Sequence, residues 1–133
     1  DENGNRVESN RIVKPKGEIE LRVNTFDKNE RMIKQKVYDD VKHKLKSEFS
    51  NTFVNGNEET VYKNYDKKEK PVWVSTVIYN ASHKILSSEF VAGKKMKRIH
   101  KTTFEYNNKN LLTQSRSFDS KDRKISENIH TYN

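Results

Sequence analysis

Apolar and polar residues alternate along several short segments of this chain, with a period of two. Ile19, Leu21 and Val23 alternate with Glu and Arg, and residues 125–130 repeat this pattern around Ile125 and Ile129. Such alternation predicts half-buried β-strands. Residues 72–79 are apolar at nearly every position, which predicts a central strand covered on both faces. Trp73, which lies in that strand, is therefore expected to be substantially buried.

Turn signals divide the chain at regular intervals. Six dipeptides join an aromatic residue to Asp or Asn: Phe26-Asp27, Tyr38-Asp39, Tyr65-Asp66, Tyr79-Asn80, Tyr106-Asn107 and Phe118-Asp119. Asp and Asn open turns by bonding the backbone two residues on, and aromatic side chains pack well at strand ends. Residues 1–7 are interpreted as a seventh such box. We expect the box Asp and Asn residues at strand ends or in loops, with the preceding aromatics packed on a sheet face.

Three further turn signals lie between the boxes, at residues 15–17, 55–57 and 92–94. Together the signals place turn centres near residues 4, 17, 29, 41, 56, 68, 82, 93, 109 and 121, a mean interval of 13. A strand of roughly 8 to 9 residues and a short loop fill that interval.

This spacing predicts an all-β fold for residues 1–133, a single repeat-built domain. We expect an antiparallel meander of about ten short strands in a thin, twisted sheet, curled enough to shelter one face. A half-barrel or closed barrel is the structural alternative. A helix over residues 29–49 is a second alternative, because Met32, Val37 and Leu45 also suit a helix. Disorder is the third, since 35% of residues are charged and 31% are hydrophobic. The regular placement of 13 aromatic residues favours a folded chain.

The termini and the absence of cysteine bear on location. Without cysteine there is no disulfide or thiolate chemistry, and the redox compartment stays open. No run of 18 apolar residues is present to span a membrane. The chain begins with Asp, so we interpret it as a mature product after leader removal or as an excised segment. The polar, Tyr- and Asn-rich composition favours an extracytoplasmic bacterial protein, periplasmic, cell-surface or secreted.

The boxes resemble the YD repeats of bacterial RHS and wall-associated proteins, in which Tyr-Asp, two residues, Gly, and Asn or Arg precede a strand. Residues 1–7 keep Asp-x-x-Gly-Asn-Arg-Val, and residues 38–39 and 65–66 keep the Tyr-Asp dipeptide. The resemblance implies an extracytoplasmic scaffold or binding role and carries no catalytic residues. Where the family has Gly, this chain has other residues: Glu30, Lys42, Glu69, His83, Asn110 and Asp122. Only Asn110 and Asp122 adopt left-handed φ at low cost, so these turns either use another geometry or arose by convergence.

Candidate chemistry is sparse. The four histidines do not stand at metal-ligand spacing. Asp39-Asp40 and residues 1–5 have the acidic character of a calcium loop, but hairpin turns explain both, and residues 1–5 lack the terminal bidentate acid. No nucleophile elbow, phosphate loop or catalytic triad is present. We therefore expect no enzymatic activity, no catalytic residue, no metal and no cofactor.

Charge is unevenly distributed along the sequence. Residues 1–66 contain 13 Lys and Arg and 13 Asp and Glu, whereas residues 67–133 contain 14 and 6. In a sequential meander, one end of the sheet should therefore be electropositive and attract anionic partners. The densest basic run is residues 94–101. If the strand alternates regularly there, Lys95, Lys97 and Lys101 share one face and Arg98 lies on the other. A solubility role, in which Lys protects exposed strands from aggregation, is the competing interpretation.

The leading hypothesis is a non-enzymatic binding or scaffold module that recognises an anionic partner or a protein surface. Its predicted binding residues are these: Lys95, Lys97, Arg98, Lys101, Tyr62 and Tyr79, with Lys94, Tyr65 and Trp73 as further contacts. The partner would be a protein, an anionic polysaccharide or a lipid head group. The alternative is an immunity protein that neutralises a bacterial toxin domain, since charge complementarity speeds association. Nucleic acid is less favoured because no aromatic platform is recognisable in the sequence. The sequence leaves the oligomeric state open.

Overall fold

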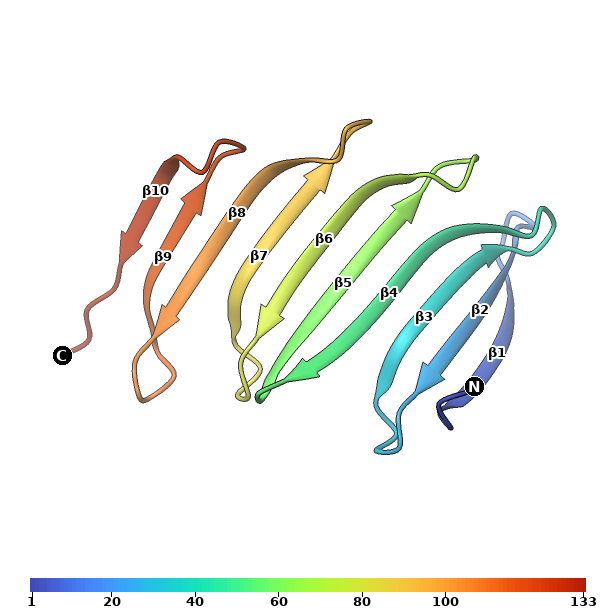
Figure 1. The fold of residues 1–133 in the computed structure, drawn as a ribbon, viewed down its shortest axis with the longest axis horizontal. Helices are drawn as coiled ribbons and strands as arrows, with labels where there is room; N and C mark the ends of the chain where they lie inside the picture. The colour runs from blue at the N-terminus through green and yellow to red at the C-terminus, as the bar shows by residue number, and fades with distance from the viewer.

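The computed structural model describes all of residues 1–133 and consists of ten β-strands joined by short turns, without any helix (Figure 1). The strands are β1 (Arg6–Val13), β2 (Ile19–Phe26), β3 (Met32–Asp39), β4 (Lys44–Val54), β5 (Asn57–Tyr65), β6 (Pro71–Tyr79), β7 (Ile85–Ala92), β8 (Lys97–Tyr106), β9 (Leu112–Phe118) and β10 (Lys124–Ile129). No helix is therefore available that is long and apolar enough to cross a membrane.

The strands form one antiparallel sheet in sequential order, from β1 to β10. This confirms the predicted meander, its ten strands and its ten turn positions. The helical alternative over residues 29–49 is wrong, because this segment forms β3, a turn and the first part of β4. The closed-barrel alternative is also wrong, because β1 pairs only with β2 and β10 only with β9, which leaves the sheet open.

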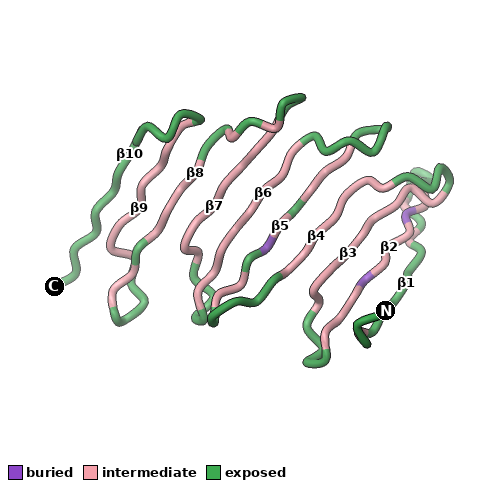
Figure 2. The backbone as a smooth tube through the Cα atoms, in the orientation of Figure 1, coloured by how far each residue is buried: buried purple, intermediate pink, exposed green.

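The sheet is a single layer without a hydrophobic core. Only Glu20, Asn24 and Thr60 are buried, and no hydrophobic side chain is (Figure 2). The prediction of a central strand covered on both faces is therefore wrong for residues 72–79. Residues 73–79, Trp73 included, are only partly buried, and Val72 is exposed. Cohesion comes largely from the strand ladders, which hold 65 of the 82 backbone hydrogen bonds.

Six of the turns share one local geometry. In each, the side chain of an Asp or Asn accepts hydrogen bonds from the backbone N–H groups two and four residues on, at 2.8–3.0 Å. The residues that open these turns are Asp1, Asp27, Asp66, Asn80, Asn107 and Asp119. The backbone N–H of the fourth turn residue closes the ring by bonding the carbonyl of the first. The box residues therefore lie at strand ends or in loops as predicted, and residues 1–7 form a turn of the same kind.

The fourth position of these turns is left-handed although most of the residues there are not glycine. It is occupied by Gly4, Glu30, Glu69, His83, Asn110 and Asp122, with φ between 57° and 74°. The geometry that glycine favours is thus retained without it. The Asp39 turn differs, since Asp39 bonds the N–H groups of Val41 and Lys42, and His43 rather than Lys42 is left-handed.

The non-glycine side chains at this position link successive turns on the same edge of the sheet. Glu30 accepts a hydrogen bond from Arg6, Glu69 accepts one from the Leu45 backbone N–H at 2.8 Å, and Asp122 pairs with Arg98. In the same way Asn110 donates to the Ser82 hydroxyl at 3.1 Å, and His83 lies 3.6 Å from Glu58. Gly4 has no side chain and makes no such contact. We infer that these contacts offset the cost of left-handed backbone at a non-glycine residue.

Replacing Asn80 with alanine tests the turn geometry. The substitution removes the acceptor for the Ser82 and Lys84 N–H groups, so the free energy of unfolding should fall by about 1–2 kcal/mol at a net 0.5–1.5 kcal/mol per hydrogen bond. Asn80→Asp keeps the acceptor and should cost much less. Urea titration followed by circular dichroism measures both variants. Equal stability of Asn80→Ala and the wild type would contradict a structural role for the boxes.

Candidate anion-binding site

Every second turn lies on the same edge of the sheet, because the strands run antiparallel. The turns β1–β2, β3–β4, β5–β6, β7–β8 and β9–β10 lie along one long edge, at the top of Figure 1. We call this the basic edge and define it by residues 13–19, 39–44, 65–71, 92–97 and 118–124. The other long edge holds residues 1–6, 26–32, 54–57, 79–85 and 106–112.

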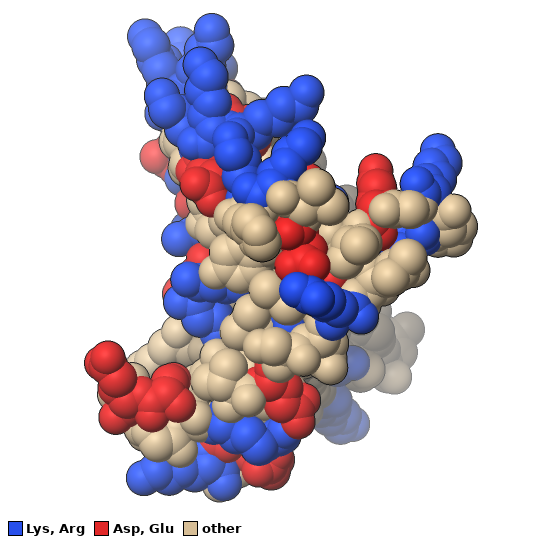
Figure 3. All heavy atoms as spheres, turned by 90° about the vertical axis from the view of Figure 1, so that its right-hand side faces the viewer, with Lys and Arg blue, Asp and Glu red and all other residues tan.

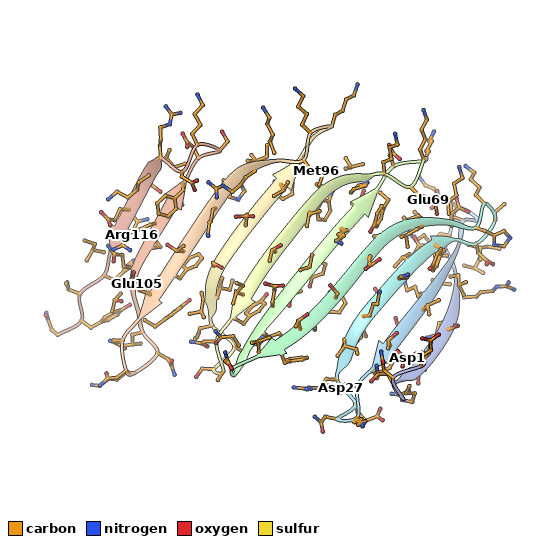
Figure 4. The ribbon with its side chains drawn as sticks, in the orientation of Figure 1. Asp1, Asp27, Glu69, Met96, Glu105 and Arg116 are labelled. Atoms are coloured by element: carbon orange, nitrogen blue, oxygen red, sulfur yellow. The ribbon has the colours of Figure 1, made fainter.

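The two long edges differ in charge. The basic edge has 13 Lys and Arg against 7 Asp and Glu, whereas the opposite edge has 5 against 4. Lysine and arginine side chains accordingly gather at the top of the molecule in Figure 3, and long side chains project from the same turns in Figure 4. Successive turns on this edge lie about 10 Å apart, twice the spacing between neighbouring strands. The edge therefore presents a line of cationic groups.

Hollows separate the basic turns. One of about 800 Å³ lies between the β5–β6 and β7–β8 turns, with Lys67, Lys68, Lys70 and Lys94 in its wall. A second, of about 470 Å³, lies between the β3–β4 and β5–β6 turns. A third, of about 330 Å³, lies between the β1–β2 and β3–β4 turns. An anionic group seated in the largest hollow would meet lysines from both flanking turns.

A buried carboxylate organises the β1–β2 end of the basic edge. Glu20 accepts hydrogen bonds from Lys14 at 2.6 Å and from Lys46 at 3.0 Å, and it lies 3.4 Å from Arg22. The hydrogen bond from Lys14 is the largest effect on the pKa of Glu20. Together with the hydrogen bond and the charge of Lys46, it outweighs burial and lowers this pKa from 4.5 to about 2. Three cations at this end are thereby engaged within the protein, whereas Lys67 and Lys94 form no ion pair.

The predicted binding residues do not form one patch. Lys95 lies in the β7–β8 turn and Lys97 begins β8, so both are part of the basic edge. Tyr62 lies on β5, where its ring is 5.2 Å from that of Phe49. Tyr79 lies at the opposite edge, stacked on His83 at 4.6 Å. The remaining predicted contacts, Tyr65 and Trp73, lie near the basic edge, at the end of β5 and the start of β6.

A β-bulge changes the predicted faces of the basic run. Arg98 pairs with Val91 and His100 with Phe90, which leaves Ile99 as the extra residue. Arg98 and Lys101 consequently share a face, whereas regular alternation predicted opposite faces. Arg98 also forms ion pairs with Asp122 and Glu89, and the bond to Asp122 raises its pKa. It is therefore committed to a contact within the protein, and reversing its charge should weaken the fold.

Sequence reasoning missed the basic residues of the earlier turns, including Lys42, Lys67 and Lys68. Their common feature is that they occur in alternate turns, which a linear count of charge along two halves of the chain does not detect. The excess positive charge therefore lies on one long edge of the sheet as well as in the C-terminal half of the chain. No group of three or more His, Asp or Glu side chains converges in the manner of a metal site.

Comparison with known proteins gives one distant structural match. No family model matches the sequence, and no curated protein matches it. One solved structure, a protein with unknown function from Bacteroides fragilis NCTC 9343, superposes with a TM-score of 0.47 and 10% sequence identity. The match covers 97% of this chain and 95% of that chain.

Proposed function

We propose that this protein is a non-enzymatic binding module that recognises an anionic partner through the basic edge. The observation that carries the proposal is the convergence of five separate turns, with 13 basic residues, on one edge of an open sheet. Hollows between those turns offer anionic groups simultaneous contact with lysines from two sides. Clustered charge of one sign attracts an oppositely charged partner and speeds its association.

The proposal includes an extracytoplasmic location in a bacterium. Its support is the resemblance of the box sequences to YD repeats, and six of these boxes form turns with one shared Asp- or Asn-centred geometry.

The competing role of the lysines, protection of the strands against aggregation, would not explain why they lie on one long edge of the sheet in preference to the other, because both edges consist of exposed turns.

Charge reversal on the basic edge tests the proposal with poly-L-glutamate as the probe. Lys67→Glu combined with Lys94→Glu should weaken binding roughly tenfold or more at low salt, because the largest hollow loses lysines from both of its turns. The matched control is Lys84→Glu with Lys109→Glu, which makes the same change in net charge on the opposite edge. Isothermal titration calorimetry measures affinity, and circular dichroism checks the fold.

Salt dependence is the second readout of the same experiment. Wild-type affinity should fall steeply between about 50 and 200 mM salt, because exposed charges are screened beyond about 8 Å at physiological ionic strength. Equal losses in the edge variant and in its control would mean that only net charge matters. That result, or no binding of the probe by the wild type, would refute the basic edge as a binding site.

A further inference from the structure

Five aromatic side chains from five successive strands form a row on one face of the sheet, just below the basic edge. They are Phe49 of β4, Tyr62 of β5, Trp73 of β6, Phe90 of β7 and His100 of β8. Strand pairing places them on the same face, since Phe49 pairs with Tyr62 and Phe90 with His100, while Trp73 lies on the side of Phe90. Ring centroids are 5.2 Å apart for Phe49 and Tyr62, 5.8 Å for Trp73 and Phe90, and 5.9 Å for Phe90 and His100.

A groove of about 480 Å³ opens at the β4–β6 end of this row and extends across the same face to β3. Tyr62 and Trp73 both line it, together with the hydroxyl-bearing Ser47 and the amide-bearing Asn64. The Tyr62 side chain is well exposed, at 42%. The groove thus combines apolar ring surface with hydrogen-bonding groups, the composition that orients a small polar ring in a binding site, and Glu48 and Lys63 also line it.

The row runs parallel to the basic edge. Trp73 lies two residues after Pro71, where β6 leaves the β5–β6 turn, and Phe90 lies two residues before Ala92, where β7 enters the β7–β8 turn. Two residues of a strand span roughly 7 Å, so the rings lie within reach of lysine side chains from those turns. A linear polymer that crosses the strands would meet rings below and cations above.

We propose that the partner of the basic edge is an anionic polysaccharide, whose sugar rings pack in the aromatic groove while its acidic groups contact the lysines of the turns. The inference rests on the proposed function and specifies its ligand. Sugar rings have apolar C–H surfaces and hydroxyl edges, which suit the aromatic rings and the Ser47 and Asn64 side chains respectively. A lipid surface would contact only the tips of the turns and leave the aromatic row unused.

The test compares two carboxylate polymers of equal charge, oligogalacturonate with sugar rings and poly-L-glutamate without them. Wild-type protein should bind oligogalacturonate about tenfold more tightly, with a change in Trp73 fluorescence. Tyr62→Ala should remove this preference and leave poly-L-glutamate affinity unchanged, because Tyr62 is exposed and uncharged. Tyr79→Ala is the matched control, since it removes a tyrosine at the opposite edge. Calorimetry gives the affinities, and circular dichroism verifies the fold of each variant.

Each remaining outcome decides a different point. Equal affinity of the wild type for both polymers would overturn the polysaccharide inference and leave the basic edge as a general anion site. Absence of binding to either polymer would refute the proposed function itself. Tighter binding of an oligothymidylate than of oligogalacturonate, with the same dependence on Tyr62, would overturn the inference in favour of a single-stranded nucleic acid, whose bases stack on aromatic side chains.

Discussion

Replacing Tyr106 with alanine is expected to lower the free energy of unfolding by about 2–4 kcal/mol, somewhat less than the 3–5 kcal/mol typical of a fully buried aromatic residue. Tyr106 closes β8 immediately before the Asn107 turn, and its hydroxyl donates a hydrogen bond to the Ile85 carbonyl at 2.7 Å. Partial burial raises the pKa of this phenol. The substitution removes both the packing of the ring and the hydrogen bond to β7.

Two variants separate these contributions in a urea titration. Tyr106→Phe keeps the ring and loses only the hydroxyl bond, so it should cost about 0.5–1.5 kcal/mol. The difference between the two variants then measures the packing of the ring. No hydrophobic residue of this sheet is buried. Each large, partly buried side chain should therefore contribute more to the free energy of unfolding than its exposed fraction suggests. A cost below about 0.5 kcal/mol for Tyr106→Ala would show that the box aromatics do not stabilise the strand ends.

Replacing Glu20 with alanine should destabilise the protein by about 1.5–3 kcal/mol, the range for hydrogen bonds to charged groups. Glu20 is 5% exposed and is bonded by Lys14 and Lys46, with Arg22 nearby. Its removal leaves three cations close together without their common counter-charge. Lys34→Ala is a suitable control, because Lys34 lies on the opposite face of the neighbouring strand from Glu20. Its ion pair with Glu48 is also longer, at 3.7 Å.

The same carboxylate makes stability depend on acid pH. Because its pKa is lowered from 4.5 to about 2 in the folded state, the stabilisation is complete above about pH 4.5 and is lost as the pH falls toward 2. The stability of the wild type should therefore decline over this window more than that of Glu20→Gln, which cannot titrate. Thermal unfolding of both proteins at several pH values measures the difference. Parallel curves would mean that Glu20 contributes no ion-pair stability.

Much of the architecture was predictable because it is encoded locally. Each Asp or Asn of the boxes forms its turn with the next four residues, so a short sequence window contains all the partners. The seven boxes and three further turn signals, at regular spacing, determine ten strands, and antiparallel neighbours follow from loops too short to permit any other connection. The same local pattern identified residues 1–7 as a turn from the Asp-x-x-Gly-Asn sequence.

Contacts between turns were not predictable from the sequence. The bond from the Leu45 N–H to Glu69 and the pairing of Arg98 with Asp122 each span 24 residues. They explain why left-handed positions carry side chains where the resemblance to YD repeats predicts glycine. The bulge at Ile99 was equally hidden, because an extra residue in a strand leaves no clear mark on composition, yet it moves Arg98 onto the face of Lys101.

The sequence by itself determined the strands, the turns and their order, because hydrogen bonding of short side chains to nearby backbone fixes each of these locally. Only the tertiary structure decided that the sheet stays open and single-layered, since layer packing depends on contacts that no local pattern specifies. It also decided the candidate site. Alternate turns meet on one edge only when the sheet is assembled, and rings as distant in sequence as Phe49 and His100 join one row only through strand register.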